Sequence, residues 1–208
     1  MHFFRRASGI PSRLAIFPGT FNPITVAHVA LARAALTLVD EVVFVLPRSF
    51  PHKDYSGASF SERVEMLQSA LTKADHCSIA AADGGLFVEI AAECRAAYED
   101  SIELSFLCGR DAAERIVHWD YGDPDFCTAM LRQFDLLVAA RHGEYSPPVR
   151  LRHAIRPLEM AGDFDHVSAT DVRERIARGE SWEHLVPEGA RELARKIYSS
   201  VDRGKDVG

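Results

Sequence analysis

The sequence predicts an α/β fold: a doubly wound, mostly parallel sheet with helices on both faces and a helical segment toward the C-terminal end. Two observations carry this prediction. Short apolar runs alternate with segments of helical periodicity along most of the 208 residues. The runs are nearly continuous in apolar residues, as in Glu-Val-Val-Phe-Val-Leu at 41–46, which indicates strands buried on both faces.

The elements follow one another in a regular order. The segment at 1–13 is basic but lacks the apolar stretch of a signal peptide, so we expect a flexible tail there and a single domain over 14–208. A Ser-Phe-Ser-Glu capping box at 59–62 predicts the start of one helix. Strands are expected at 14–17, 41–46, 77–80, 103–108, 134–140 and 154–155, and helices at 26–38, 60–71, 86–98, 112–119, 170–177 and 188–198.

Composition excludes several classes of protein. The net charge of −6 argues against non-specific nucleic-acid binding, which needs many basic residues to neutralise phosphates. No apolar run reaches the roughly 18 residues needed to span a membrane, so no membrane partner is expected. The four cysteines form no C-x-x-C pair, and we interpret them as buried free thiols of a cytoplasmic protein. A homo-oligomer stays open.

The loop after the first strand carries the first candidate site. Ligands of such sheets bind outside the carboxyl ends of the strands, so the loops that follow strands are where to look. Gly19 allows a close backbone approach, the N–H groups at the following helix start can hold a phosphate, and His28 lies one turn further on. The chain has no G-x-x-x-x-G-K-[ST] and no G-x-G-x-x-G after a strand, which argues against a P-loop protein or a common dinucleotide site.

A second candidate lies near the other end of the chain. In His-Val-Ser-Ala-Thr-Asp-Val-Arg at 166–173, Ser168 or Thr170 can cap a helix and leave N–H groups for an anion. Arg173 is then one turn into the helix, where its planar guanidinium can clamp a phosphate.

Together these two segments resemble a known superfamily. Gly-x-Phe-Asn-Pro-x-Thr-x-x-His at 19–28 is similar to the (H/T)-x-G-H signature of nucleotidyltransferases, and 166–173 is similar to their I-S-S-T-x-x-R motif. The resemblance is closest to nicotinate and nicotinamide mononucleotide adenylyltransferases, and Leu-Val-Pro-Glu at 185–188 resembles the tail of the bacterial enzymes. Thr25 stands where many members have His, and Ala27 where Gly is usual. The likeness covers about 14–198.

The resemblance implies roles for further residues. It places His28, Thr25, Lys53 and Arg173 in catalysis. Lys53 lies in a Pro-His-Lys segment, and Arg63 and Met66 follow it as in the family. Gly109-x-Asp111 with Trp119 is similar to the family's G-x-D…W segment, and Arg141-His-Gly to its S-R-x-G turn. The substrate-binding residues implied in this way are Gly19, Thr20, Phe21, Asn22, Gly109, Asp111, Trp119, Arg141, Ser168 and Thr170.

The implied activity is transfer of an adenylyl group from ATP to the phosphate of nicotinate or nicotinamide mononucleotide, with release of pyrophosphate, in NAD biosynthesis. Mg²⁺ is expected to bind mainly through the phosphates of ATP. Residues 84–90 lack the hydroxyl groups with which bacterial members recognise nicotinate, and Glu89 would repel a carboxylate. Three alternatives therefore stay open: a pantetheine-phosphate adenylyltransferase, a cytidylyltransferase that uses CTP, and a nucleotide-binding protein without catalysis.

Overall fold

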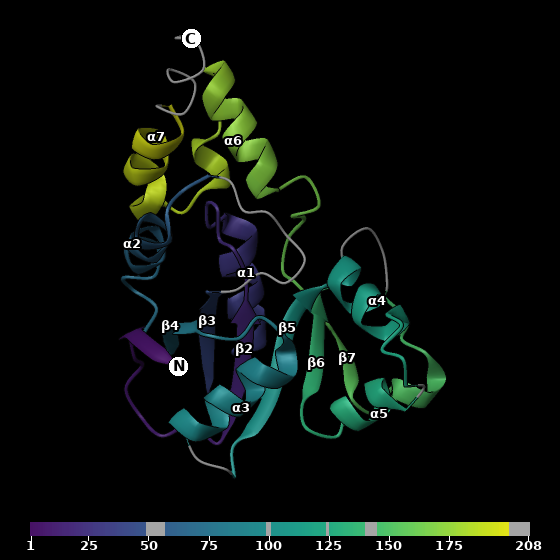
Figure 1. The fold of residues 1–208 in the computed structure, drawn as a ribbon. Coiled ribbons are helices and arrows are strands. Elements are labelled where there is room, and N and C mark those ends of the chain that lie inside the picture. The colour runs from purple at the N-terminus through teal and green to yellow at the C-terminus, as the bar shows by residue number, and fades with distance from the viewer. Residues whose placement is uncertain (49–56, 99–100, 124, 140–144, 200–208) are drawn as a thin grey trace.

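The computed structural model of the chain describes residues 1–48, 57–98, 101–123, 125–139 and 145–199. Its centre is a seven-stranded sheet with the order β1-β4-β3-β2-β5-β6-β7 (Figure 1). The pairs from β4 to β7 are all parallel, and β1 is antiparallel to β4. The strands are β1 (His2–Arg5), β2 (Arg13–Pro18), β3 (Glu41–Pro47), β4 (Cys77–Ala82), β5 (Glu103–Gly109), β6 (Asp135–Ala139) and β7 (Ile155–Leu158).

Along the chain, helices connect the parallel strands β2, β3, β4, β5 and β6 in turn, and the described part of the β6–β7 connection contains a 3-10 turn. The chain first builds outward from β2 through β3 to β4, then returns to the other side of β2 and builds outward through β5, β6 and β7. The order reverses between β2 and β5, which makes that pair the switch point at which such sheets bind ligands. The predicted fold class is confirmed. The helices are α1 (Val26–Ala35), α2 (Phe60–Ala70), α3 (Phe87–Ala97), α4 (Arg110–His118), α5 (Phe126–Met130), α6 (Ala169–Arg178) and α7 (Arg191–Ser199), with 3-10 turns at Val149–Leu151, Glu183–Leu185 and Glu188–Ala190.

The sheet is buried on both faces by two separate hydrophobic clusters. Along β3, Val42, Phe44 and Leu46 pack in the cluster that includes α1, α2, α6 and α7. Val43 and Val45 point to the opposite face and pack with α3, α4 and α5. This period-2 alternation explains why the strand sequences are apolar throughout, because neither face is left to water.

The expectation of a flexible tail at 1–13 is wrong for residues 2–5. They form β1, which pairs with the edge of β4 in the register His2 to Ala81 and Phe3 to Ala80. Arg5 donates hydrogen bonds to the carbonyl oxygens of Leu71 and Ala74, just beyond the end of α2. The strand is therefore held by tertiary partners that a four-residue run does not reveal: a sheet edge to pair with, and a helix C-terminus that attracts a cation.

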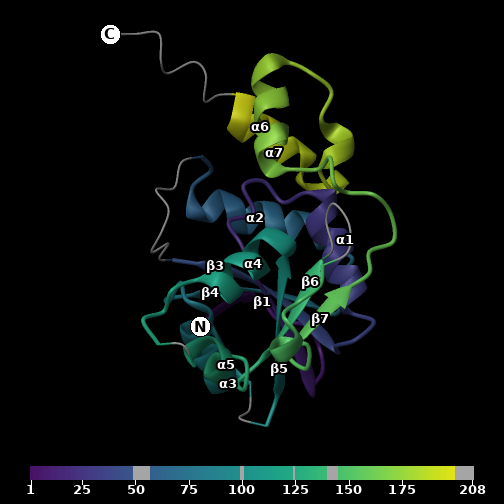
Figure 2. The same ribbon diagram turned by 90° about the vertical axis from the view of Figure 1, so that its right-hand side faces the viewer.

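The two C-terminal helices lie together at one end of the molecule, next to α1 and α2 (Figures 1 and 2). Gly189 brings these helices against α2: a Cβ atom at that position would lie 2.1 Å from the carbonyl oxygen of Ser69. Ala194, Ile197 and Tyr198 of α7 are buried in the same cluster as α2. The helices predicted at 170–177 and 188–198 are thus part of the fold's core, and they lie close to the start of the chain's first helix.

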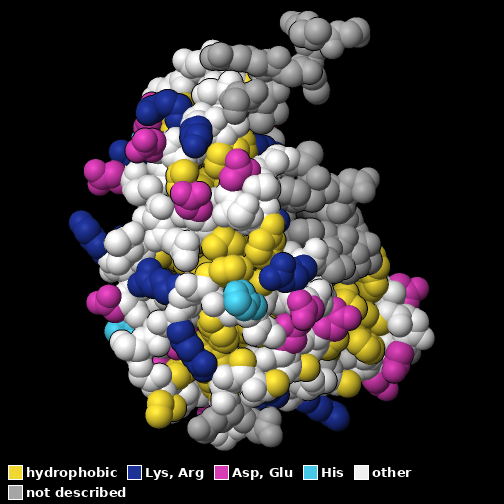
Figure 3. All heavy atoms as spheres, turned by 60° about the vertical axis from the view of Figure 1, so that its left-hand side comes forward, with side chains coloured by type: hydrophobic (Ala, Val, Ile, Leu, Met, Phe, Trp, Pro, Cys, Tyr) yellow, Lys and Arg dark blue, Asp and Glu magenta, His cyan; other side chains and the backbone are white. Residues whose placement is uncertain are grey.

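Three further features of the fold concern membrane-spanning helices, the cysteines and the surface charge. No described helix combines the length and apolar character needed to cross a membrane. All four cysteines are free and buried, as predicted. On the face drawn in Figure 3, the described Lys and Arg side chains lie interspersed with Asp and Glu side chains rather than gathered in one basic field.

Candidate active site

The loop that follows β2 is fixed at its start by the sheet and by an aromatic anchor. The N–H group of Gly19 donates to the carbonyl oxygen of Val45 at 3.0 Å. Phe21 has a left-handed backbone with φ of 47° and is 1% exposed. Its ring packs against Phe17, Phe44 and His28 at centroid distances of 5.3–5.4 Å. Any ligand would therefore meet the backbone of Phe21, because its side chain belongs to the core.

A buried arginine orients the next peptide of the loop. Arg63, on α2 and 3% exposed, donates from Nη1 to the carbonyl oxygen of Thr20 at 3.1 Å. Because a trans peptide points its N–H opposite to its C=O, the N–H of Phe21 is directed away from Arg63. Among the described residues, no hydrogen bond engages the N–H of Thr20 or of Phe21. Two consecutive N–H groups of this kind make a concave site for an anion.

His28 is held in one tautomer by the residue that caps α1. The N–H of Thr25 donates to His28 Nδ1 at 2.9 Å, and Thr25 Oγ1 lies 2.9 Å from the same nitrogen. A neutral imidazole that accepts at Nδ1 carries its proton on Nε2, so Nε2 is a donor. Thr25 is 1% exposed. Its hydroxyl therefore contacts the His28 ring.

Arg173 joins the two segments that the sequence singled out. From α6, its Nη1 donates to the carbonyl oxygen of Asn22 at 2.6 Å and to that of Ala169 at 3.2 Å. Its Nη2 donates to Thr170 Oγ1 at 3.2 Å. The half-buried guanidinium thus lies directly on the loop after β2, although 151 residues separate it from Asn22.

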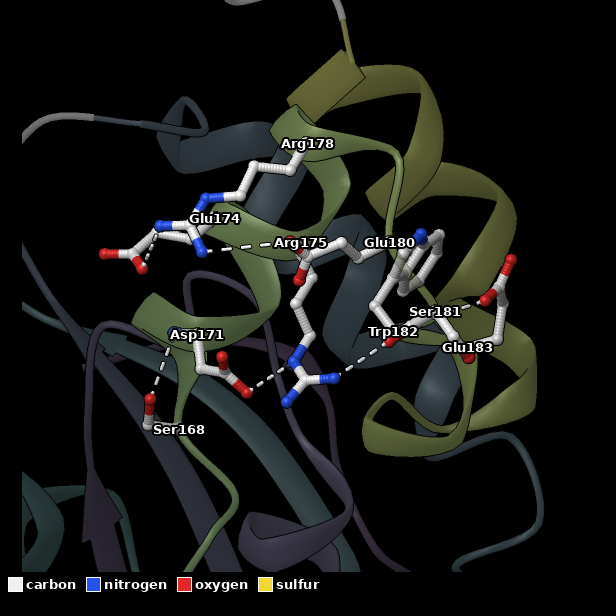
Figure 4. Close-up of polar contacts among 9 residues, drawn as sticks. All are labelled: Ser168, Asp171, Glu174, Arg175, Arg178, Glu180, Ser181, Trp182 and Glu183. Atoms are coloured by element: carbon white, nitrogen blue, oxygen red, sulfur yellow. Dashed lines mark hydrogen bonds and ion pairs between the residues drawn. The ribbon is translucent and has the colours of Figure 1, made fainter.

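The polar side chains around the start of α6 divide into two groups. Ser168 is the N-cap, since its Oγ accepts from the N–H of Asp171 at 3.0 Å, and Thr170 instead steadies Arg173. On the other side of the helix, Arg175 bridges Asp171 at 2.8 Å and the carbonyl oxygen of Ser181 at 3.2 Å (Figure 4). Arg175 fastens α6 to the turn before α7, which leaves Arg173 as the arginine of this helix that faces the loop.

The third group of predicted residues lies along α4, after β5. Gly109 is the N-cap of α4, and a Cβ atom there would meet nothing within 4 Å. Asp111 is exposed in the first turn, and Trp119 ends the helix with 53% of its surface exposed. Both line an open surface groove together with Glu114, Arg115 and His118. Since β5 is the neighbour of β2 at the switch point, the start of α4 flanks the same crevice as the Gly19 loop.

Two predicted residues, Lys53 and Arg141, lie outside the described part of the chain. The segment at 84–90 is described, and its amides are engaged internally. Glu89 accepts from the N–H groups of Gly85 and Leu86 at 2.9 and 3.0 Å, which caps α3. Glu93 accepts from the N–H of Gly84 at 3.0 Å. The acidic residue noted in the sequence is therefore part of a helix cap.

Two further residues hold the loop, and their contacts are not predicted from the sequence. Arg63 stands out in the sequence only as a match to the family, and Tyr198 has no predicted role. Tyr198 donates from its hydroxyl to Asn22 Oδ1 at 2.5 Å across 176 residues of sequence. Neither contact can be predicted from the local sequence pattern, because the tertiary fold brings the partners together.

This arrangement defines the class of protein. A parallel sheet that reverses between β2 and β5, with the N-termini of α1 and α4 and an arginine of α6 gathered at its carboxyl edge, is a doubly wound α/β protein of the nucleotide-binding type.

Comparison with known proteins narrows the class. The cytidylyltransferase-like family model matches residues 16–175. A protein of Rubrobacter xylanophilus named "Probable nicotinate-nucleotide adenylyltransferase" is 32% identical over 207 residues, covering 92% of this chain and 94% of that protein. One of the same name from Moorella thermoacetica is 31% identical over 202 residues, covering 89% and 90%. The Plasmodium falciparum nicotinic acid mononucleotide adenylyltransferase complexed with NaAD shares the fold, with a TM-score of 0.68 at 15% identity over 90% of this chain and 98% of that one. The chain belongs to the cytidylyltransferase-like family of nucleotidyltransferases.

Proposed function

We propose that the protein transfers the adenylyl group of ATP to the phosphate of nicotinate or nicotinamide mononucleotide and releases pyrophosphate, a step of NAD biosynthesis. The observation that carries this proposal is the bond from Arg173 to the carbonyl oxygen of Asn22. It brings a planar cation onto the loop that carries the two directed N–H groups and leads into the first turn of α1, where His28 lies. Such a set of donors suits a polyphosphate.

The geometry supports the following chemistry. An oxygen of the acceptor phosphate attacks the α-phosphorus of ATP in line, and the bond from that phosphorus to the bridging oxygen breaks, so pyrophosphate leaves. His28 Nε2 donates to the α-phosphate oxygens as charge develops on them, with Thr25 fixing the ring. Arg173, with the start of α6 at Ser168 and Thr170, holds the β- and γ-phosphates. No side chain forms a covalent bond, so catalysis rests on positioning and charge.

Mg²⁺ is proposed to enter with the nucleotide. The described residues contain no group of three or more His, Cys, Asp or Glu side chains arranged to hold a metal ion. Binding through phosphate oxygens and water suits Mg²⁺, which gives up its waters reluctantly. The ion would neutralise phosphate charge, and excess chelator should abolish turnover until Mg²⁺ is restored. The four buried free cysteines fit a reducing cytoplasmic setting.

Between the two mononucleotides, one observation favours nicotinamide. The resemblance places segment 84–90 at the acceptor base, and there Glu89 and Glu93 already occupy the amides of Gly84, Gly85 and Leu86. A nicotinate carboxylate would meet these acidic groups, whereas the neutral carboxamide would not be repelled. The names of the relatives point to nicotinate. Turnover with each of the two mononucleotides is therefore the measurement that decides between them.

The test is an acceptor panel with the purified full chain. Nicotinate mononucleotide, nicotinamide mononucleotide and phosphopantetheine are each incubated with Mg²⁺ and either ATP or CTP, and both pyrophosphate and the joined product are measured. We expect turnover with ATP and a pyridine mononucleotide. Turnover confined to phosphopantetheine or to CTP would assign a different member of the family. ATP binding without pyrophosphate release for any acceptor would show a binding protein.

A further inference from the structure

Asn22 is a junction between three parts of the fold. Its side-chain oxygen Oδ1 accepts from the hydroxyl of Tyr198 on α7 at 2.5 Å and from the N–H of Ala58, just before α2, at 3.2 Å. Its backbone oxygen accepts from Arg173 on α6. Asn22 is 5% exposed and Tyr198 4% exposed, so these bonds are made away from water. Such bonds are costly to lose, because a buried partner is left without its donor.

The fit around Asn22 is tight as well as polar. Gly57, with φ of +125°, passes so close that a Cβ atom would lie 2.4 Å from Asn22 Nδ2 and 2.8 Å from Oδ1. The side-chain amide is therefore confined by the chain that leads into α2 on one side and by α7 on the other. Only small rotations of the amide are compatible with these contacts.

We propose that Tyr198 is a positioning residue for nucleotide binding, and that it acts through Asn22. Its hydroxyl fixes the Asn22 side chain, which fixes the peptide whose carbonyl oxygen anchors Arg173. Docking of the C-terminal helix α7 thereby sets where the guanidinium stands relative to the N–H groups of the Gly19 loop. This inference rests on the proposed function for its kinetic readout, although it concerns ATP binding alone.

The experiment is a double-mutant cycle on the full chain with Tyr198→Phe and Asn22→Ala. Tyr198→Phe keeps the buried ring and removes only the hydroxyl. We expect the KM for ATP to rise and kcat/KM for ATP to fall about tenfold or more, with the KM for the acceptor unchanged. Because Tyr198 acts through Asn22, the double variant should be no worse than Asn22→Ala alone. The affinity for ATP with Mg²⁺, measured by calorimetry without acceptor, should weaken in parallel.

Tyr98→Phe is the matched control. The Tyr98 hydroxyl also makes a 2.5 Å hydrogen bond, to Glu41 Oε1. Glu41 is the first residue of β3 and so lies at the amino-terminal end of the strands, away from the loops of the candidate site. The Tyr98→Phe variant should have a lower melting temperature and unchanged kinetic constants.

Three outcomes decide the matter. Additive losses in the cycle, or a Tyr198→Phe variant that differs only in melting temperature, would overturn the inference. A wild-type chain that binds ATP but releases no pyrophosphate would refute the proposed function. The calorimetric comparison of wild type with Tyr198→Phe would then decide the role of Tyr198 by itself.

Discussion

Arg173 Nη1 lies 2.6 Å from the carbonyl oxygen of Asn22, and this bond joins α6 to the loop before α1 across 151 residues of sequence. The guanidinium also donates to the carbonyl oxygen of Ala169 and to Thr170 Oγ1, both on its own helix. Its position is therefore set jointly by α6 and by the loop after β2. A phosphate bound at that loop would meet the arginine already in place.

Replacing Arg173 by Lys should be poorly tolerated. A lysine ammonium keeps the charge but cannot satisfy Asn22, Thr170 and a phosphate with the planar fork that a guanidinium offers. We expect kcat/KM for ATP to fall about a hundredfold, as for the loss of a preorganised donor. Arg178→Lys is the control, since Arg178 is exposed on the same helix and pairs with Glu174 and Glu180. Steady-state kinetics near wild type for Arg173→Lys would remove the residue from the site.

Two substitutions of His28 can distinguish the role of Nδ1 from that of Nε2. His28→Asn keeps a side-chain oxygen able to accept from the N–H of Thr25, as Nδ1 does, but lacks the Nε2 donor. His28→Ala lacks both. We expect both variants to fold and both to lose about a hundredfold or more in kcat, with Ala the less stable because it also loses the cap of α1.

Circular dichroism, urea denaturation and single-turnover rates would check this expectation. His76→Ala, at an exposed site just before β4, is the control and should match wild type. Full turnover in His28→Asn would show that the transition state does not use Nε2.

The sequence predicted those parts of the fold whose causes are local. The buried run at 14–17 is β2, and the capping box at 59–62 starts α2, with Ser59 Oγ accepting from Glu62 N and Glu62 Oε2 from Ser59 N. Strand β1 was missed because pairing with β4 and the bonds of Arg5 to the end of α2 stabilise it. The five-residue α5 was missed because it is too short to show periodicity.

For the candidate site, the sequence located both end segments but not the atoms that meet. The distance from Arg173 to Asn22 depends on where α6 docks, which no spacing in the sequence encodes. The Thr25 hydroxyl lies 2.9 Å from His28 Nδ1 because the helix start turns it inward, a contact that the spacing of the two residues does not specify. Arg63 and Tyr198 act on the loop from α2 and α7, so their roles appear only once those helices are packed.

Replacing Gly109 or Gly189 by alanine should change the unfolding free energy by different amounts. At Gly109 the backbone is extended and the space beside it is open, so Gly109→Ala should cost less than about 1 kcal/mol, the loss of a favourable N-cap residue. If ligand occupies that space, the same change should raise the KM for a substrate. At Gly189 the new methyl group would meet the backbone of α2 at 2.1 Å, and Gly189→Ala should cost about 1–3 kcal/mol of unfolding free energy. Urea denaturation and substrate KM for both variants check this pair, and a Gly109→Ala chain destabilised more than Gly189→Ala would contradict it.

The buried cysteines should make the unfolding free energy depend on pH. Burial raises the pKa of Cys77 to about 11 and those of Cys94 and Cys108 to about 12, whereas an unfolded thiol has a pKa of about 8.5. The native thiols therefore stay protonated at pH 8 and should react with a thiol reagent only when the chain unfolds. Between pH 8.5 and 11 the unfolded chain releases protons that the native chain retains, so the unfolding free energy should fall as pH rises across that window. Cys94→Ala should show a shallower fall, and rapid labelling of the native wild type at pH 8 would show that the thiols are accessible.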